Sequence, residues 1–166
     1  MNIKNARNAA LVAMAAALLV GTVTSQTPQQ HAKSGSMSLA TPDDLKWVQI
    51  RPGNEMAVVY GDPGKAGEMY AVRFRFADGF KVPAHWHPQD EHATVLQGTL
   101  LLGMGTKWDA GLLATTMTTG SYIFVPKDMP HFAQAKGETI LQAHGIGPFQ
   151  IIYANPADDP KNQAKP

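Results

Sequence analysis

The fold of this chain is decided by Gly79-Phe-Lys-Val-Pro-Ala-His85-Trp-His87-Pro-Gln-Asp-Glu91-His-Ala-Thr-Val-Leu-Gln-Gly98. Side chains two residues apart on a β-strand point to the same face, so His85 and His87 can reach one ligand together. Pro88 and Asp90 favour a turn, which lets Glu91 fold back to the same side at the start of the next strand. The stretch therefore predicts two strands joined by a turn, with two imidazoles and a carboxylate close to that turn.

A second segment of the same kind supplies a third imidazole. His131 follows the tight turn expected at residues 126–130 and so begins another strand. Three imidazoles and one carboxylate form a suitable ligand set for a divalent transition metal. His92 should point away from this set because it is next to Glu91, although a longer turn would make it an alternative ligand. Asp90 and Glu91 should also diverge on their strand, which argues against a paired acid/base site.

The rest of the chain reads as strands and turns. Met69–Phe76 alternates between aromatic or aliphatic residues on one face and arginines on the other, and Gln97-Gly98 is a plausible hairpin turn. No segment carries a sustained helical period, and about ten short strands are expected, which favours an antiparallel sandwich or barrel. Besides the histidine segment, the predicted strands are Trp47–Ile50, Met56–Tyr60, Met69–Phe76, Glu91–Leu96, Thr99–Met104, Tyr122–Val125, His131–Ala135, Thr139–Ala143 and Gln150–Tyr153.

Two motifs in register carry a resemblance to a known family. Every fixed position of the first cupin motif is matched by Gly79-x5-His85-x-His87-x3-Glu91-x6-Gly98. The second cupin motif corresponds to Gly120-x5-Pro126-x-Asp128-x2-His131-x3-Ala135, which departs from the family at Asp128, usually Gly, and at Ala135, often Asn. The chain thus resembles the cupin superfamily, and in particular small exported bacterial single-domain (type-2) cupins whose role is largely undefined.

The resemblance implies an all-β fold, a single cupin-type jelly-roll β-barrel over residues 41–154. It implies one divalent transition metal (Mn, Fe, Ni, Co, Cu or Zn) with two open positions of an octahedron, and its ligands would be His85, His87, Glu91 and His131. The expected function is that of a metal-dependent, dioxygenase-like enzyme acting on a small organic molecule. The alternatives are a cupin lyase or isomerase and a non-catalytic module that binds a small molecule or a metal. Because cupins often pair through barrel edges, a homodimer is also compatible with the resemblance.

Other polar side chains suggest supporting roles around the site. Gln142 and His144 share one strand face and could line the barrel pocket, where His144 would act as a catalytic base or hydrogen-bond donor. The alternative is a histidine in a turn before Gly145. Arg73 and Arg75 share a face and could clamp a carboxylate substrate, although a solvated sheet face is the simpler interpretation. Residues 105–119 connect the two motifs and could form a lid, a partner-contact hairpin or an ordinary connection.

The N-terminal residues have the pattern of a secretory signal peptide. Lys4 and Arg7 precede an unbroken apolar run at residues 9–20, and small residues follow it. The run is too short to span a bilayer, so no stable membrane anchor is expected after cleavage, which we place at the end of residues 1–25. Residues 26–40 would form a flexible leader and residues 155–166 a polar tail. The sequence thus predicts a protein of the periplasm or a secreted protein.

Composition narrows the function classes further. The 166 residues contain no cysteine, which excludes thiolate metal ligands, cysteine catalysis and a lipid anchor on a lipobox cysteine. Cleavage would remove Lys4 and Arg7 but no acidic residue, which changes the formal net charge from +1 to −1. No basic run is present, so nucleic acid is not an expected partner, and the expected partner is a small-molecule ligand or substrate.

Overall fold

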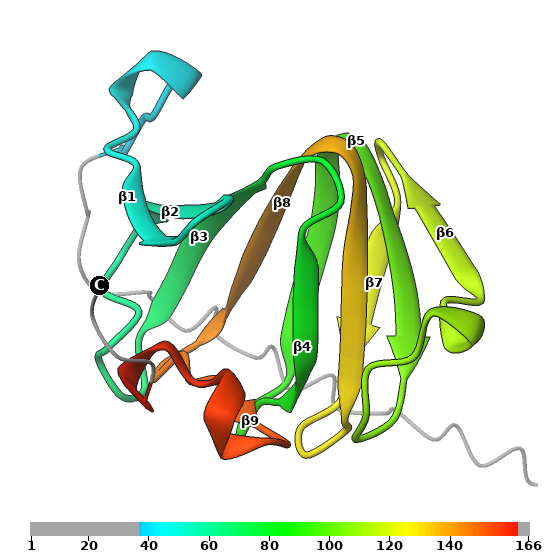
Figure 1. Cartoon of the computed structure of the whole chain (residues 1–166). Coiled ribbons are helices and arrows are strands. Elements are labelled where there is room, and N and C mark those ends of the chain that lie inside the picture. Colours follow the sequence, from blue (N-terminus) through cyan, green and yellow to red (C-terminus); the bar gives the residue numbers. More distant parts are fainter. Residues whose placement is uncertain (1–36, 163–166) are drawn as a thin grey trace, which may run out of the picture. The chain divides into compact units, whose positions relative to one another are not determined.

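The computed structural model describes residues 37–162, which form an all-β fold (Figure 1). The predicted signal peptide and most of the predicted leader lie outside the described residues. No helix in residues 37–162 has the length and apolar character needed to cross a bilayer. The strands are β1 (Val48–Arg51), β2 (Asn54–Tyr60), β3 (Met69–Phe76), β4 (Lys81–Trp86), β5 (Glu91–Met104), β6 (Thr115–Thr118), β7 (Tyr122–Val125), β8 (His131–Ile146) and β9 (Ile152–Tyr153). The short 3-10 helices are η1 (Pro42–Asp44), η2 (Ala110–Leu112), η3 (Pro156–Asp158) and η4 (Pro160–Asn162).

The strands form one curled antiparallel sheet in which β8 occupies the central place. β8 continues the order β1-β2-β3-β8-β4-β9, and it also pairs with β5 along almost its whole length. β5 in turn carries β7 beside its first half and β6 beside its second half. The segment between the two motifs contains η2 and β6, and β6 pairs with β5 as part of the sheet. The arrangement is the jelly-roll β fold that the sequence predicts.

β5 and β8 are each longer than the sequence predicts. We expected a hairpin turn at Gln97-Gly98 and a break between Ala135 and Thr139, but β5 runs unbroken for 14 residues and β8 for 16. The two strands stay paired from His92 opposite His144 to Met104 opposite His131, with register shifts around Gln97. The prediction of a hairpin at Gln97-Gly98 was therefore wrong, because the glycine bends a continuous strand.

Gly98 has a conformation and a neighbourhood that only glycine allows. Its φ is +76°, in the left-handed region that disfavours side chains. A Cβ at this position would overlap the carbonyl oxygen of Glu138 and lie 2.8 Å from Oγ1 of Thr139. Gly98 therefore lets β5 and the bend of β8 approach each other closely, which is how both strands turn together.

Alternation along the strands builds the core. In β3 the even-numbered residues are buried and the arginines between them face outward, as the sequence predicts. The core cluster comes from the inner faces of β3, β5, β7 and β8. The buried core cluster contains Tyr70, Val72, Phe74, Phe76, Ala93, Val95, Leu100, Ile123, Val125, Ala133, Ala135, Leu141 and Ala143.

We predict that Gly98→Ala destabilises the fold by about 2 to 4 kcal/mol, because backbone strain and a clash with backbone atoms add together. Gly120→Ala is a matched control, since Gly120 also has a positive φ (+88°) but no atom within 4 Å of an added Cβ. This control should lose only about 1 kcal/mol, the cost of the left-handed backbone. Urea unfolding measures both changes, and equal losses would contradict the proposed close approach.

Candidate metal centre

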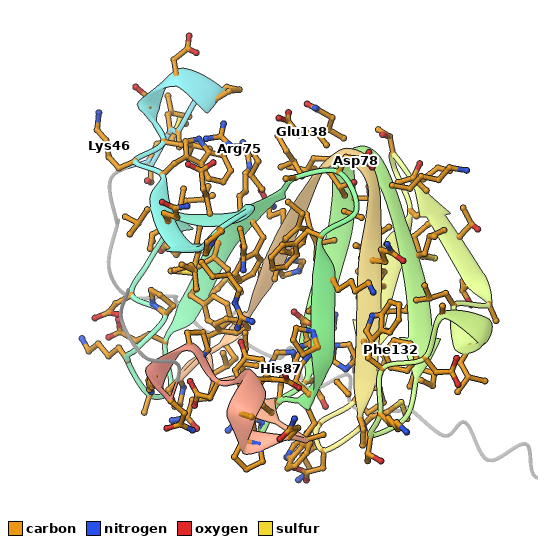
Figure 2. All side chains as sticks on the ribbon, in the orientation of Figure 1. Lys46, Arg75, Asp78, His87, Phe132 and Glu138 are labelled. Carbon is orange, nitrogen blue, oxygen red and sulfur yellow. The ribbon has the colours of Figure 1, made fainter. Side chains whose placement is uncertain are left out.

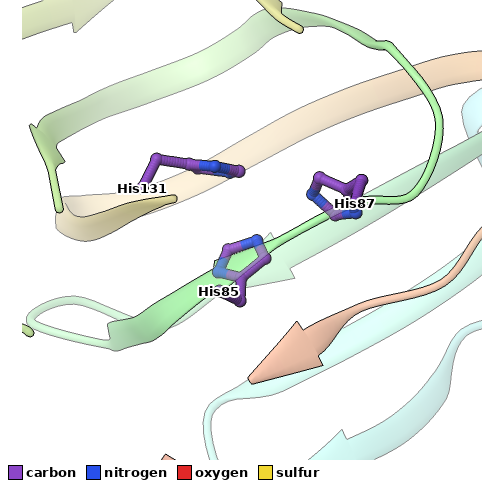
Figure 3. Close-up of side chains that lie close together, drawn as sticks. All are labelled: His85, His87 and His131. Carbon is purple, nitrogen blue, oxygen red and sulfur yellow. The ribbon is translucent and has the colours of Figure 1, made fainter. Parts of the chain in front are cut away.

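Three histidine side chains lie close together, and strand pairing sets two of them opposite each other (Figure 3). His85 lies on β4 and is the cross-strand partner of His131, the first residue of β8. His87 follows the end of β4, two residues on and therefore on the same side as His85. All three side chains are buried, and their ligand atoms lie within 4.8 Å of one another.

Glu91 completes this group from the first position of β5. Its Oε2 lies 3.3 Å from Nε2 of His87 and 3.7 Å from Nε2 of His131, and the residue is 8% exposed. The turn through Pro88 brings it back, as the sequence predicts. Asp90 does not join it, because its Oδ1 accepts a hydrogen bond from the backbone N–H of Lys127. The structure therefore gathers His85, His87, Glu91 and His131, and leaves the neighbouring carboxylate outside.

A backbone carbonyl holds each imidazole by its Nδ1 atom. The contacts join His85 to Pro83 (2.7 Å), His87 to Gln150 (2.7 Å) and His131 to Met129 (3.1 Å). A carbonyl oxygen can only accept a hydrogen bond, so each Nδ1 must carry the proton. In the neutral ring Nε2 is then a bare lone pair, which is the form that ligates a metal.

Burial and the neighbouring charges set the protonation of the cluster. Burial, aided by the imidazoles of His131 and His87, lowers the pKa of His85 to about 3. Burial also lowers the pKa of His131. Burial acts in the same sense on His87, but the nearby Glu91 carboxylate outweighs it and raises that pKa. Burial likewise opposes ionisation of Glu91, and the surrounding imidazoles outweigh it, so the pKa of Glu91 is lowered.

The cluster fits a bound cation. Nε2 of His87 is buried without a hydrogen-bond partner, although the Glu91 carboxylate is close to it. The Nε2 atoms of His85 and His131 and the ionised carboxylate of Glu91 converge here, and all three accept rather than donate. Nε2 of His87 joins them when that ring is neutral. Such a group leaves unmet acceptors unless a proton or a metal ion enters it. Three nitrogens and one oxygen are the donor types that divalent transition metals take in proteins.

The turn before His131 uses an aspartate where cupins usually have glycine. Asp128 adopts φ +61°, the only positive φ among the non-glycine residues that the structure describes. Aspartate tolerates this region better than most residues do. The backbone N–H of Asp128 donates to the carbonyl of His87 over 2.8 Å, which ties the turn to the first motif. The departure in sequence thus preserves a glycine-like turn, and His131 keeps its place.

The four side chains form one wall of a largely apolar cavity. The cavity has a volume of about 70 Å³. The apolar walls include Phe74, Phe76, Phe80, Leu100, Ile123 and Phe149, and the polar lining outside the cluster is Arg51, Asn54 and Tyr153. Sequence reasoning missed these polar residues, because no motif or spacing signals that β1, β2 and β9 border this cavity. A small molecule with a mostly apolar body matches such a site.

His144 does not belong to this cavity. It pairs with His92 across β5 and β8, their ring centroids lie 5.5 Å apart, and both line a separate hollow on the outer face of the sheet. The prediction that His144 and Gln142 line the barrel pocket was wrong, because Ala143 between them is fully buried and alternation turns its neighbours outward. His92 points away from Glu91, as alternation predicts. His144 therefore lies outside the lining of the cavity that contains the buried cluster.

Arg73 and Arg75 do not form a carboxylate clamp. Nε of Arg73 donates to Gln142 over 3.0 Å. Arg75 pairs with Glu55 over 2.6 Å, and its guanidinium carbon lies 4.3 Å from the centre of a Trp47 ring. In Figure 2 Arg75 lies at the end of the sheet away from His87. Both arginines therefore serve the outer face, in line with the simpler of our two interpretations.

Comparison with known structures supports the same fold. The chain is similar to KdgF from Halomonas sp. (TM-score 0.53, 20% identity, 69% of this chain and 96% of that chain). It is similar to an RmlC-like cupin from Shewanella frigidimarina (TM-score 0.52, 20% identity, 66% of this chain and 89% of that chain). It is also similar to the polyketide cyclase RemF from Streptomyces resistomycificus (TM-score 0.58, 18% identity, 75% of this chain and 89% of that chain). Identities this low speak for the fold alone.

Comparison by sequence agrees with the motifs. No curated protein matches the chain. Residues 72–146 match the family model for the cupin domain, and this range contains both motifs and all four clustered side chains. The match to the family model shows that residues 72–146 of the chain form a cupin domain, and the jelly-roll fold agrees with it.

Proposed function

We propose that this protein is a metal-dependent, dioxygenase-like enzyme that acts on a small organic molecule. The ligands would be His85, His87, Glu91 and His131, and the metal one divalent ion of Mn, Fe, Ni, Co, Cu or Zn. One observation carries the proposal: Nε2 lone pairs held by Nδ1–H···O=C bonds meet an ionised carboxylate at the wall of an apolar cavity. A metal bound there would supply Lewis-acid catalysis or oxygen activation.

The residues of the chain contribute positioning and exclusion of water. The three carbonyl contacts hold the imidazole rings and direct each Nε2 atom toward the cluster. Phenylalanine and aliphatic walls surround the cluster and lower the local dielectric, which strengthens every electrostatic interaction with a substrate. A lyase or isomerase reaction, or ligand binding without chemistry, would use the same parts.

Export is part of the proposal. The basic residues, apolar run and small residues within residues 1–25 have the order of a cleaved signal peptide. We expect N-terminal sequencing of the protein from a periplasmic or culture fraction to start near residue 26. Protein that keeps Met1 and stays in the cytoplasm would contradict export.

We predict about one divalent metal ion per purified chain by elemental analysis. His85→Ala should weaken metal affinity at least about tenfold, because one ligand is lost from a preformed set. His92→Ala is the matched control, since this histidine lies on the outer face and should leave metal content unchanged. A chelator should lower the thermal unfolding midpoint of the parent protein. Metal-free parent protein, or a His85→Ala variant with the parent's affinity, would overturn the site.

We predict that protein stripped of metal loses stability as the pH falls from 7 to 5. Folding lowers the pKa of His85 from 6.5 to about 3, so the unfolded chain binds a proton there that the folded chain does not. Linkage makes this one group cost about 2 kcal/mol over that interval. His131 acts in the same direction, and His87, with its raised pKa, offsets part of the loss.

Urea unfolding at several pH values measures this dependence. His85→Asn removes the group and should give a shallower slope between pH 7 and pH 5. Identical slopes in the parent and His85→Asn would show that His85 titrates in the folded chain as it does in the unfolded one.

Oxygen consumption separates the enzymatic alternatives. With a redox-active metal bound, we expect oxygen uptake with at least one compound from a panel of enolic and phenolic chelators, followed with an oxygen electrode. His85→Ala should abolish the uptake, and His92→Ala should leave it unchanged. Metal-loaded protein that binds such compounds without oxygen uptake would favour the lyase, isomerase or binding-module alternatives.

A further inference from the structure

The hairpin between β1 and β2 places two polar residues in the wall of the cavity. Arg51 ends β1 and Asn54 begins β2, and the two residues are Cα partners across the turn at Pro52-Gly53. Both line the cavity that contains the histidine cluster. β1 and β2 are the first two strands in the order of the sheet, away from the strand β4 that carries His85. Arg51 and Asn54 are therefore polar residues of the cavity that are separate from the proposed metal ligands.

Unpaired buried atoms gather in this one cavity. Within residues 37–162, the buried side-chain polar atoms that lack a hydrogen-bond partner are Nε of Arg51, Oδ1 of Asn54 and Nε2 of His87. All three residues line the same cavity. An unsatisfied buried donor or acceptor costs free energy, so a fold retains it where a ligand supplies the partner. Nε2 of His87 is explained by a metal, and the other two atoms need a different ligand.

The Arg51 guanidinium is held in place but keeps a free donor and an unpaired charge. Its Nη2 donates to the hydroxyl of Tyr153 over 2.7 Å, and its central carbon lies 5.4 Å from the centre of that ring. Tyr153 is the cross-strand partner of His85, so the same strand pair carries a metal ligand and the support of the arginine. Among the residues described, no carboxylate lies within ion-pair distance of Arg51.

From this arrangement we infer that Arg51 and Asn54 form a subsite for a small organic acid. The Nε–H of Arg51 donates to the carboxylate of the ligand, and Oδ1 of Asn54 accepts from a hydroxyl group beside that carboxylate. The phenylalanine and aliphatic walls contact the apolar remainder of the molecule. A carboxylate suits the guanidinium better than a phosphate does, because these walls offer few further donors for extra oxygens. The subsite itself does not require a metal. Contact between the bound acid and a metal rests on the proposed function.

Calorimetric titration of the full, metal-loaded chain tests the subsite with glycolate, lactate and mandelate. Each acid is compared with its neutral amide, and lactate is also compared with propionate, which lacks the hydroxyl group. The acids should bind at least about tenfold more tightly than the amides, because a hydrogen bond to a charged group is worth about that much. Lactate should bind more tightly than propionate.

Variants assign these preferences to the two residues. Arg51→Gln should lose the preference for acids over amides, with metal content and thermal midpoint unchanged, and Arg51→Lys should recover part of it through its charge. Asn54→Leu should equalise lactate and propionate while keeping the preference for acids. Arg73→Gln is the matched control, since it removes an arginine that is already bonded to Gln142, and it should bind like the parent.

The outcomes distinguish this inference from the metal proposal. Protein that lacks metal but still prefers acids through Arg51 would sustain the subsite and defeat the metal centre. Metal-loaded protein that binds acids and amides equally, binds none of the panel, or keeps its preference for acids in Arg51→Gln would overturn the subsite. Elemental analysis of each preparation separates these cases.

Discussion

The pairing of β8 with three other strands is the constraint on which the site depends. β8 pairs with β4 over its first residues, with β3 over its last, and with β5 along both parts. These pairings set His131 opposite His85 and bring the start of β5, and so Glu91, to the same end of the sheet. A register shift of one residue in β4 or β8 would turn an imidazole to the opposite face. The clustering of these side chains is thus a consequence of strand register.

The cavity is unusual for a protein interior because charged and polar side chains lie within an apolar core. A core of phenylalanine and aliphatic residues surrounds an ionised carboxylate, three imidazoles and a guanidinium without a carboxylate partner. Burial raises the free energy of every unpaired member of this group. The carbonyl contacts satisfy one nitrogen of each imidazole and leave the other facing inward. A cation at the cluster and an anion at Arg51 would satisfy the cavity at both places with opposite charges.

The local sequence pattern was sufficient to predict most strands and the clustered side chains. It did not predict that β5 and β8 run unbroken, nor which residues of β8 face the core. The spacing of His85, His87 and Glu91 and the turn before His131 are local signals, and the structure gathers these side chains as expected. Gly98 with a positive φ suits either a hairpin turn or a bend, and only its contact with the neighbouring strand β8 decides between them. The face of β8 that carries Gln142 and His144 depends on tertiary pairing with β3 and β5. Arg51 reaches the cavity through the edge of the sheet, which no local pattern encodes.

Two cross-strand histidine pairs in this sheet show which surroundings make imidazoles suited to bind a metal. His85 with His131 and His92 with His144 are both antiparallel partners, with ring centroids 4.3 Å and 5.5 Å apart. In the first pair a backbone carbonyl accepts a hydrogen bond from each Nδ1–H, and the Glu91 carboxylate adds a negative charge in surroundings of low dielectric. In the second pair His92 meets the hydroxyl of Tyr122, which can donate or accept, and the outer face is open to water. Pairing and residue type are shared, so burial, a fixed tautomer and an adjacent carboxylate account for the difference.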